Sequence, residues 1–172
     1  AKNTDALIGG VAKVLQDEGI TLCDSTILLK PLLADLGPMT KRKLTSDEER
    51  DIKYGRRVAA ALSSFDIGQS VAIAERACLA VEAMEGTDAM LERAASLANG
   101  RDIRLVKGSQ RRQHMQFDVP VAGLRTIETM KRTKATALAV DAGRTLLLDR
   151  EEMLAMAQAA GIAVVGFAPE GD

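Results

Sequence analysis

The sequence predicts an α/β fold: a mixed β-sheet flanked by helices, with a short N-terminal helical and linker segment. Short apolar runs rich in β-branched residues alternate with longer segments whose apolar residues recur at helical spacing. Glycines and capping residues lie between many of these runs, as turns and helix ends require. Two hairpin-like pairs of strands interrupt the alternation, so we expect a mixed sheet rather than a parallel one.

The N-terminal part predicts a helix followed by a linker. Residues 5–16 place their apolar side chains on one helical face, and 20–23 have the composition of a short strand. Ser25 is expected to cap a brief helix that Pro31 interrupts. The basic run 41–43 lies in a loop that is the best linker candidate. Such a run is usually solvated, with a phosphate or an anionic lipid headgroup as the alternative ligand.

From residue 46 onward the pattern alternates helix and strand. Ser46 and Glu49 fit a capping box and predict a helix over 46–62. The further helices are expected at 88–98, 126–132 and 150–160, with Thr87, Thr126 and Asp149 as their caps. The expected strands are 70–73, 78–83, 103–107, 117–121 and 135–140. The run 145–148 is apolar, and 162–165 is expected to complete the core.

Composition limits the possible functions. The chain has 172 residues, of which 47% are hydrophobic, which is enough for a core in one domain with an appended segment. A net charge of −1 and an aromatic content of 2% argue against a nucleic-acid partner. Cys23 and Cys78 lie in apolar runs that predict buried, reduced thiols, and no apolar stretch is long enough to span a membrane. We therefore expect a cytoplasmic protein.

The stretch 80–91 joins the end of a predicted strand, a tight turn and the start of a predicted helix. It carries three carboxylates, Glu82, Glu85 and Asp88, with Gly86 to turn the chain. Ligands of open α/β sheets bind at such strand ends. The acids also suit the dipole of the following helix, and this stretch alone favours capping over catalysis.

Asp118 is a carboxylate inside the apolar run 117–121. Burying an unpaired carboxylate costs on the order of several kcal/mol. Asp118 therefore needs a partner if its strand is interior, and faces water if the strand lies at an edge. Asp66 is equally compatible with a turn residue and a site residue.

Oxygen ligands remain once other chemistries are excluded. The sequence has no GxGxxG turn, no Walker lysine motif and, with one His and two separated Cys, no zinc-ligand set. Carboxylates suit Mg²⁺ or Mn²⁺, which assist attack on phosphate esters, and Lys107 and Arg144 are candidates to neutralise phosphate oxygens. The candidate acids, mostly at predicted strand ends, are Asp66, Glu82, Glu85, Asp88, Asp118 and Asp141.

Four motifs occur in a fixed order along the chain. They are DIGQSV at 66–71, AVEAMEGTDAM at 80–90, FDVPVAG at 117–123 and AVDAGRTLLLDR at 139–150. Together they resemble the LpxI-type UDP-2,3-diacylglucosamine pyrophosphatases, over nearly the whole chain. The resemblance implies a Mg²⁺-dependent cytoplasmic enzyme of lipid A synthesis that hydrolyses UDP-2,3-diacylglucosamine to UMP and 2,3-diacylglucosamine 1-phosphate.

The resemblance also suggests residue roles. Asp118 is expected to be catalytic, by binding the metal or orienting water, and Glu85, Asp88 and Asp66 are the further metal candidates. Lys107 would hold phosphate, and Gln69 would bind a sugar or phosphate oxygen. The full set of expected substrate-binding residues is Gln69, Gly86, Thr87, Lys107, Gln113 and Arg144.

The segment 110–116 departs from the family pattern Lys-Pro-x-Gln-Asp-x-Arg. Gln113 is kept, but Gln110, His114 and Gln116 stand where the family has lysine, aspartate and arginine. This change favours an alternative function, in which a non-catalytic relative binds a phosphorylated glycolipid or nucleotide. A third possibility is an interaction module whose acids only cap helices.

Family members carry an additional N-terminal α/β domain. The resemblance therefore implies that residues 1–45 are a linker at the end of a missing domain, and that 46–172 form a C-terminal catalytic domain that needs it for activity. The expected partner is a nucleotide-linked glycolipid. No long basic amphipathic helix is present, so contact with the inner membrane is expected only through the substrate. A homodimer is an open alternative.

Overall fold

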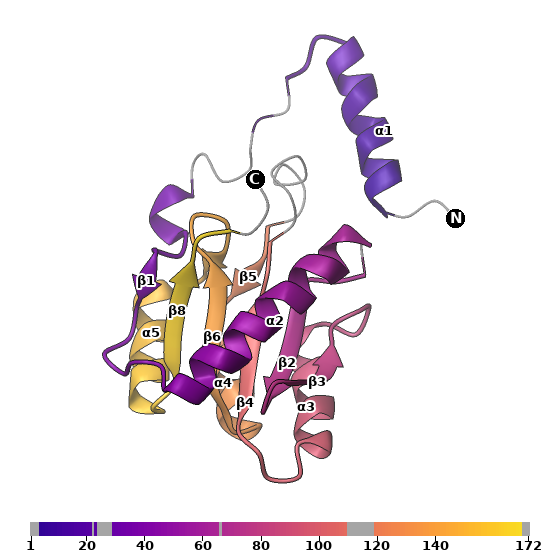
Figure 1. The fold of residues 1–172 in the computed structure, drawn as a ribbon. Helices are drawn as coiled ribbons and strands as arrows, with labels where there is room; N and C mark the ends of the chain where they lie inside the picture. Colours follow the sequence, from indigo (N-terminus) through magenta and orange to yellow (C-terminus); the bar gives the residue numbers. More distant parts are fainter. Residues whose placement is uncertain (1–3, 22, 24–28, 66, 110–118, 170–172) are drawn as a thin grey trace.

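A computed structural model places six strands in one mixed sheet with helices on both faces, which confirms the predicted α/β class (Figure 1). The structure describes residues 4–21, 23, 29–65, 67–109 and 119–169.

The N-terminal segment differs from the prediction after its first helix. Helix α1 (Thr4–Asp17) is present as expected and stands apart from the sheet (Figure 1). Residues 20, 21 and 23 form no strand, and Ser25 lies outside the described residues. After a short 3-10 turn (Lys30–Leu32), the predicted linker contributes a strand to the sheet, β1 (Gly37–Pro38), which pairs antiparallel with the last strand.

The remaining elements follow the predicted alternation. The helices are α2 (Ser46–Ser64), α3 (Thr87–Leu97), α4 (Leu124–Arg132) and α5 (Arg150–Ala159). The strands of the main sheet are β2 (Ser70–Ala74), β3 (Ala77–Val81), β4 (Ile103–Lys107), β6 (Ala135–Asp141) and β8 (Ala163–Phe167). Two short strands, β5 (Val121–Ala122) and β7 (Leu146–Leu147), pair separately. β5 is shorter than the predicted strand 117–121, whose residues 117 and 118 lie outside the described residues.

The strand order is β1-β8-β6-β4-β2-β3. Strands β4, β6 and β8 are parallel, and β2 runs antiparallel to β4. We call the side where the parallel strands end the carboxyl edge, and the side where they begin the amino edge. Because β2 runs the opposite way, its first residue also lies at the carboxyl edge.

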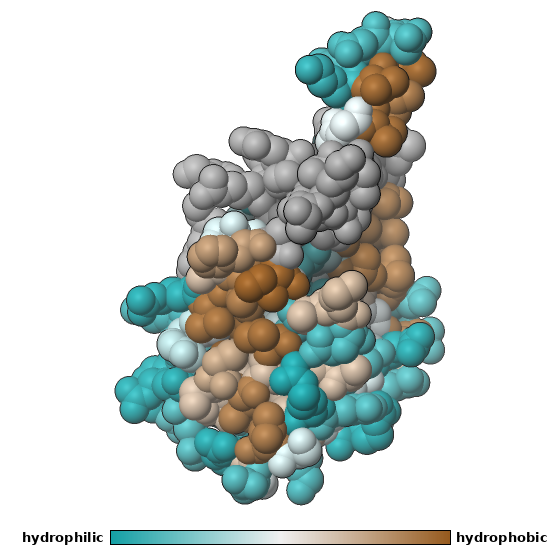
Figure 2. Space-filling model, turned by 90° about the vertical axis from the view of Figure 1, so that its right-hand side faces the viewer, coloured by the Kyte–Doolittle hydropathy of each residue, from teal (hydrophilic) through white to brown (hydrophobic). Residues whose placement is uncertain are grey.

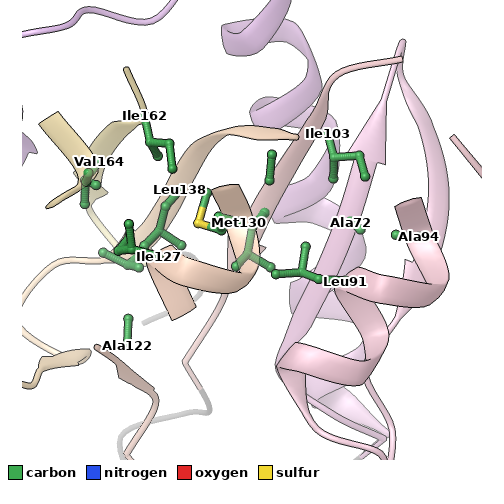
Figure 3. Packing of buried hydrophobic residues seen from close by; sticks show 14 of the residues in the cluster. Ala72, Leu91, Ala94, Ile103, Ala122, Ile127, Met130, Leu138, Ile162 and Val164 are labelled. Atoms are coloured by element: carbon green, nitrogen blue, oxygen red, sulfur yellow. The ribbon is translucent and has the colours of Figure 1, made fainter. Parts of the chain in front are cut away.

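Two apolar clusters hold the helices against the sheet. Helix α2 covers one face through Ile52 and Ala59, and its Gly55 lies so close that a Cβ there would be 2.8 Å from side-chain carbons of Ile73 and Val106. Helices α3, α4 and α5 cover the other face, where side chains such as those labelled in Figure 3 interdigitate. The sheet is therefore the middle of three layers.

The N-terminus of α2 is capped one residue earlier than predicted. Thr45, not Ser46, is the N-cap: its Oγ1 accepts a hydrogen bond from Glu48 N, and the Glu48 carboxylate accepts one from Thr45 N. Both hydroxyl residues are followed by a glutamate three positions later, so the local motif fits either register. The burial of Glu48 and its contact with Thr136 of β6 select the earlier one.

The predicted cap of α4 is also wrong. Gly123 is the N-cap of α4, and Thr126 lies inside the helix, where its hydroxyl accepts a hydrogen bond from Gly123 N. Asp149 is the N-cap residue of α5, as predicted, but it adopts a left-handed conformation and its side chain makes no capping hydrogen bond.

The predicted burial of both cysteines is also incorrect. Cys23 is exposed, whereas Cys78 on the edge strand β3 is half-buried, and its burial raises the pKa of the thiol. Among the described residues, no helix has both the length and the apolar character needed to cross a membrane.

Candidate functional site

Buried polar residues lie together at the carboxyl edge of the sheet, where packing of an apolar core does not require them. Lys107 ends β4, Asp141 ends β6 and Ser70 begins β2, and all three are buried. Open α/β sheets bind their ligands beyond this edge, because the loops that follow parallel strands meet there.

Lys107 is the centre of a hydrogen-bonded cluster. Its side chain is 8% exposed, and Nζ donates to Ser70 Oγ at 3.0 Å and to Thr87 Oγ1 at 2.7 Å. Thr87 Oγ1 donates in turn to Glu82 Oε1 at 2.9 Å, and Glu82 Oε2 lies 3.8 Å from Nζ. The cluster therefore presents a nearly buried positive charge, held by two hydroxyl groups and one carboxylate.

The start of α3 differs from the prediction in a way that affects this cluster. Gly86 is the N-cap, with φ 84°, and as a glycine it offers no side chain to cap the helix. Thr87, the predicted cap, is instead the first helical residue and directs its hydroxyl to Lys107 and Glu82. A helix N-terminus without a side-chain cap favours an anion, because backbone N–H groups and the helix dipole point at it.

The other acids of this turn are engaged locally. Glu85 accepts a hydrogen bond from Arg93 at 2.5 Å and another from Ala83 N at 3.0 Å. The hydrogen bond from Arg93 is the main cause that lowers the pKa of Glu85. Asp88, in the first turn of α3, is half-exposed and lies 3.5 Å from Arg125 of α4.

Asp141 organises the neighbouring part of the edge. Its Oδ2 accepts hydrogen bonds from Ser109 N at 2.7 Å and Ser109 Oγ at 2.8 Å, which fixes the point where the chain leaves β4. Its Oδ1 lies 3.7 Å from Arg56, whose guanidinium stacks over the Phe167 ring at 4.9 Å. Arg144 is buried in the turn after β6, and its backbone N donates to Asp141 O at 3.3 Å.

Gln69 lies at the same edge, one residue before β2. Its backbone oxygen accepts a hydrogen bond from Gly108 N at 2.8 Å, which joins the start of β2 to the end of β4. Gly68 packs against the end of β3 so closely that a Cβ on it would lie 2.0 Å from the backbone oxygen of Glu82.

The predicted metal candidates do not form a ligand set among the residues described. No group of three His, Cys, Asp or Glu side chains in that part of the chain is placed to hold an ion. Asp118, Asp66 and Gln113 lie outside the described residues. The structure therefore does not describe the expected catalytic residue, one further metal candidate and one expected substrate-binding residue.

Comparison with known proteins gives one consistent match. The family described as the LpxI C-terminal domain matches residues 35–165. The UDP-2,3-diacylglucosamine pyrophosphatase LpxI of Caulobacter vibrioides is 33% identical over 176 residues, covering 98% of this chain and 63% of that protein. The chain belongs to the LpxI family. It spans less than two thirds of the length of the Caulobacter LpxI.

Sequence reasoning assigned no role at the LpxI site to three residues of the edge. Ser70 lies in the motif DIGQSV but is not among the expected site residues, and the pairing of β2 with β4 brings it near Lys107. Ser109 lies in none of the four motifs, and the pairing of β4 with β6 brings it near Asp141. Glu82 was one of six candidate acids, and its place at the end of a strand was the available signal. The sequence does not show that Glu82 lies near Lys107, which is 25 residues further along the chain.

Proposed function

We propose that this chain is the catalytic part of a UDP-2,3-diacylglucosamine pyrophosphatase, which hydrolyses the pyrophosphate to give UMP and 2,3-diacylglucosamine 1-phosphate in lipid A synthesis. Membership of the LpxI family and the name of the Caulobacter relative support this activity. The observation that carries it is the nearly buried ammonium of Lys107 beside the open N-terminus of α3.

A pyrophosphate carries its charge on oxygens that both of these features can bind. Lys107 supplies a fixed positive charge, and the first N–H groups of α3 supply hydrogen-bond donors aligned with the helix dipole. In a site shielded from water, such fixed donors stabilise charge that develops on the leaving phosphate. Arg144, in the turn after β6, is the candidate for a second cationic contact with the substrate.

Exposed apolar side chains at the same edge support a substrate with acyl chains. Phe65 and Ile67, between α2 and β2, are exposed, and Met84, just after β3, is fully so. Gly68 brings these two segments together by lying against Glu82. Figure 2 shows one side of the molecule, where apolar residues form a patch at mid-height. Contact with the inner membrane through the lipid substrate, in the cytoplasm, is part of this proposal.

Asp118 remains the proposed catalytic residue, and Mg²⁺ or Mn²⁺ the proposed cofactor. Both come from the resemblance to the family and from the preference of carboxylates for these ions. The described acids alone do not fit a metal site, since Glu85 is held by Arg93 and no set of three converges. The proposed contacts with the pyrophosphate therefore come from Lys107, the start of α3 and Arg144, and not from these acids.

The test measures UMP release from UDP-2,3-diacylglucosamine, with Mg²⁺ or Mn²⁺ and with EDTA. The proposed function predicts release that needs the divalent ion and is abolished by Asp118→Ala, while Asp102→Ala, at the amino edge, leaves it intact. The altered segment 110–116 favours the second candidate, a non-catalytic binder. Saturable binding of the substrate without UMP at any metal concentration would establish that alternative.

A further inference from the structure

We propose that Glu82 is a positioning residue, which fixes the direction of the hydrogen bonds around Lys107 and thereby aims its ammonium at the substrate. This inference rests on the proposed function for its effect on turnover. Nothing in the family resemblance assigns a role to Glu82.

The donors and acceptors of the cluster allow only one direction at Thr87. An ammonium group can only donate, so Thr87 Oγ1 must accept from Lys107 Nζ at 2.7 Å. A threonine hydroxyl has a single proton, and Glu82 Oε1 accepts it at 2.9 Å. Glu82 therefore fixes where the Thr87 proton points and leaves a lone pair of the hydroxyl directed at Lys107 Nζ.

The second oxygen of Glu82 has a different function. Oε2 is buried and, within the described part of the chain, accepts no hydrogen bond, yet it lies 3.8 Å from Lys107 Nζ. The two side chains are 14% and 8% exposed. At such burial a positive charge needs a nearby negative one, and this carboxylate supplies it without taking one of the ammonium protons.

The backbone around Glu82 is rigid enough to hold this geometry. Glu82 N donates to Ser70 O at 2.8 Å, and Gly68 lies directly against the Glu82 carbonyl. Ser70 also accepts from Lys107 through its hydroxyl. The acid, the two hydroxyl groups and the ammonium are therefore fixed to each other through adjoining strands, as a preorganised charge requires.

The test uses two double-mutant cycles with Glu82→Gln and Lys107→Met. Glutamine keeps the shape of the side chain but loses its charge and one acceptor. The first cycle measures the urea midpoint. We expect each single variant to unfold earlier and the double variant to lose less than the sum of the two. Additive losses would show that the residues do not act on each other and would overturn the proposal.

The second cycle measures UMP release. We expect Glu82→Gln to lower kcat about tenfold with KM unchanged or lower, because a negative charge near the pyrophosphate is lost while the ammonium loses its direction. In the Lys107→Met background, the same change should have less than a twofold effect. If Glu82→Gln lowered kcat by the same factor with and without Lys107→Met, or left kcat at the wild-type value, a positioning role would be contradicted.

Two controls separate the possible failures. Glu92→Gln alters an exposed acid of α3 that pairs with Arg132, and should shift the urea midpoint only slightly and leave kcat unchanged. Thr87→Val removes the hydroxyl that links Glu82 to Lys107 and should reproduce the loss in kcat, even if Lys107→Met fails to fold. A wild-type protein that releases no UMP would refute the proposed function and any catalytic role of Glu82. The urea cycle would then test only the pairing of Glu82 with Lys107.

Discussion

Glu48 at the amino edge and Glu82 at the carboxyl edge are both largely buried glutamates, but their oxygens have different partners. Glu48 is 2% exposed and accepts four hydrogen bonds, two from Arg42, one from Thr45 N and one from Thr136 Oγ1. Glu82 accepts one, from Thr87, and keeps an oxygen that no described residue bonds.

The same difference extends to the rest of the two edges. At the amino edge, Asp51 accepts hydrogen bonds from Glu75 N and Arg76 N and pairs with the buried Arg104 at 3.4 Å, so its charge serves a turn and a strand. At the carboxyl edge, α3 begins without a side-chain cap. Arg104 Nε, like Glu82 Oε2, has no hydrogen-bond partner among the described residues, but its charge is paired with Asp51. The difference between the edges is therefore that the charges of the amino edge pair with each other, whereas those of the carboxyl edge lie beside a helix start that favours an anion.

The largest expected effect is at the amino edge. Arg104→Met should lower the free energy of unfolding by about 3–5 kcal/mol, because it leaves the buried Asp51 carboxylate without its charged partner. Urea unfolding measures this loss. UMP release per folded molecule should stay near wild type. Arg132→Met breaks an exposed pair with Glu92 and should cost at most about 1 kcal/mol. An equal cost for the two variants would refute the distinction.

The lowered pKa of Glu48 predicts that the stability of the fold depends on pH. Burial opposes its ionisation, but hydrogen bonds from Arg42, Thr136 and Thr45 outweigh burial and lower its pKa from 4.5 to about 2. A lowered folded-state pKa stabilises the fold above pH 4.5, and this stabilisation disappears as the pH falls toward 2. At pH 7, Glu48→Gln should therefore cost about 3 kcal/mol.

The control for Glu48→Gln is its exposed neighbour in the sequence, Glu49→Gln, which should behave as wild type. Denaturant titrations at several pH values measure the gap between wild type and Glu48→Gln. The gap should narrow between pH 4.5 and pH 2. A gap that is constant over this range would mean that the charge of Glu48 contributes nothing.

Lys107→Met should mainly lower activity, whereas Arg104→Met should mainly lower stability. We expect at least about a 100-fold loss of kcat/KM, the size of effect typical of removing one donor from a preorganised charge site. The loss of stability should be smaller than for Arg104→Met. Steady-state UMP release and urea unfolding measure the two effects, with the exposed Lys131→Met as the matched control. A Lys107 variant that is only destabilised would make the carboxyl edge structural too.

The sequence predicts the fold well wherever local pattern and tertiary packing agree. Strand β4 was predicted at 103–107, as observed, because its apolar residues fill both faces of the sheet. The short strand β1 was missed because Gly37 and Pro38 have the composition of a loop, and only pairing with β8 makes them a strand. A contact between residues distant in sequence also determines that Thr45 is the N-cap of α2, because the Thr136 hydroxyl donates to Glu48 and holds it in place.

The candidate site was predictable to a smaller extent. Lys107 is predicted as a cation that neutralises phosphate, and Thr87, in the second family motif, as a substrate-binding residue. The structure brings their side chains within 2.7 Å of each other. The function of Thr87 was not predictable, because a threonine beside a glycine at a helix start fits a cap as well as a site. Its contact with Lys107 requires β4 to lie next to β2, a pairing that no local motif specifies.

The smallest expected effect concerns Gly86, which begins α3 at φ 84° with nothing within 4 Å of the position of a Cβ. Gly86→Ala should therefore cost about 1 kcal/mol of stability through backbone conformation alone. Gly9→Ala, in the exposed α1, should be neutral or slightly stabilising, because alanine is the better helix former. If the carboxyl edge is a ligand site, Gly86→Ala should also weaken substrate binding, since it turns the first N–H groups of α3 away from Lys107. Thermal unfolding and the KM for UMP release measure the two effects, and an unchanged KM would separate the helix start from the site.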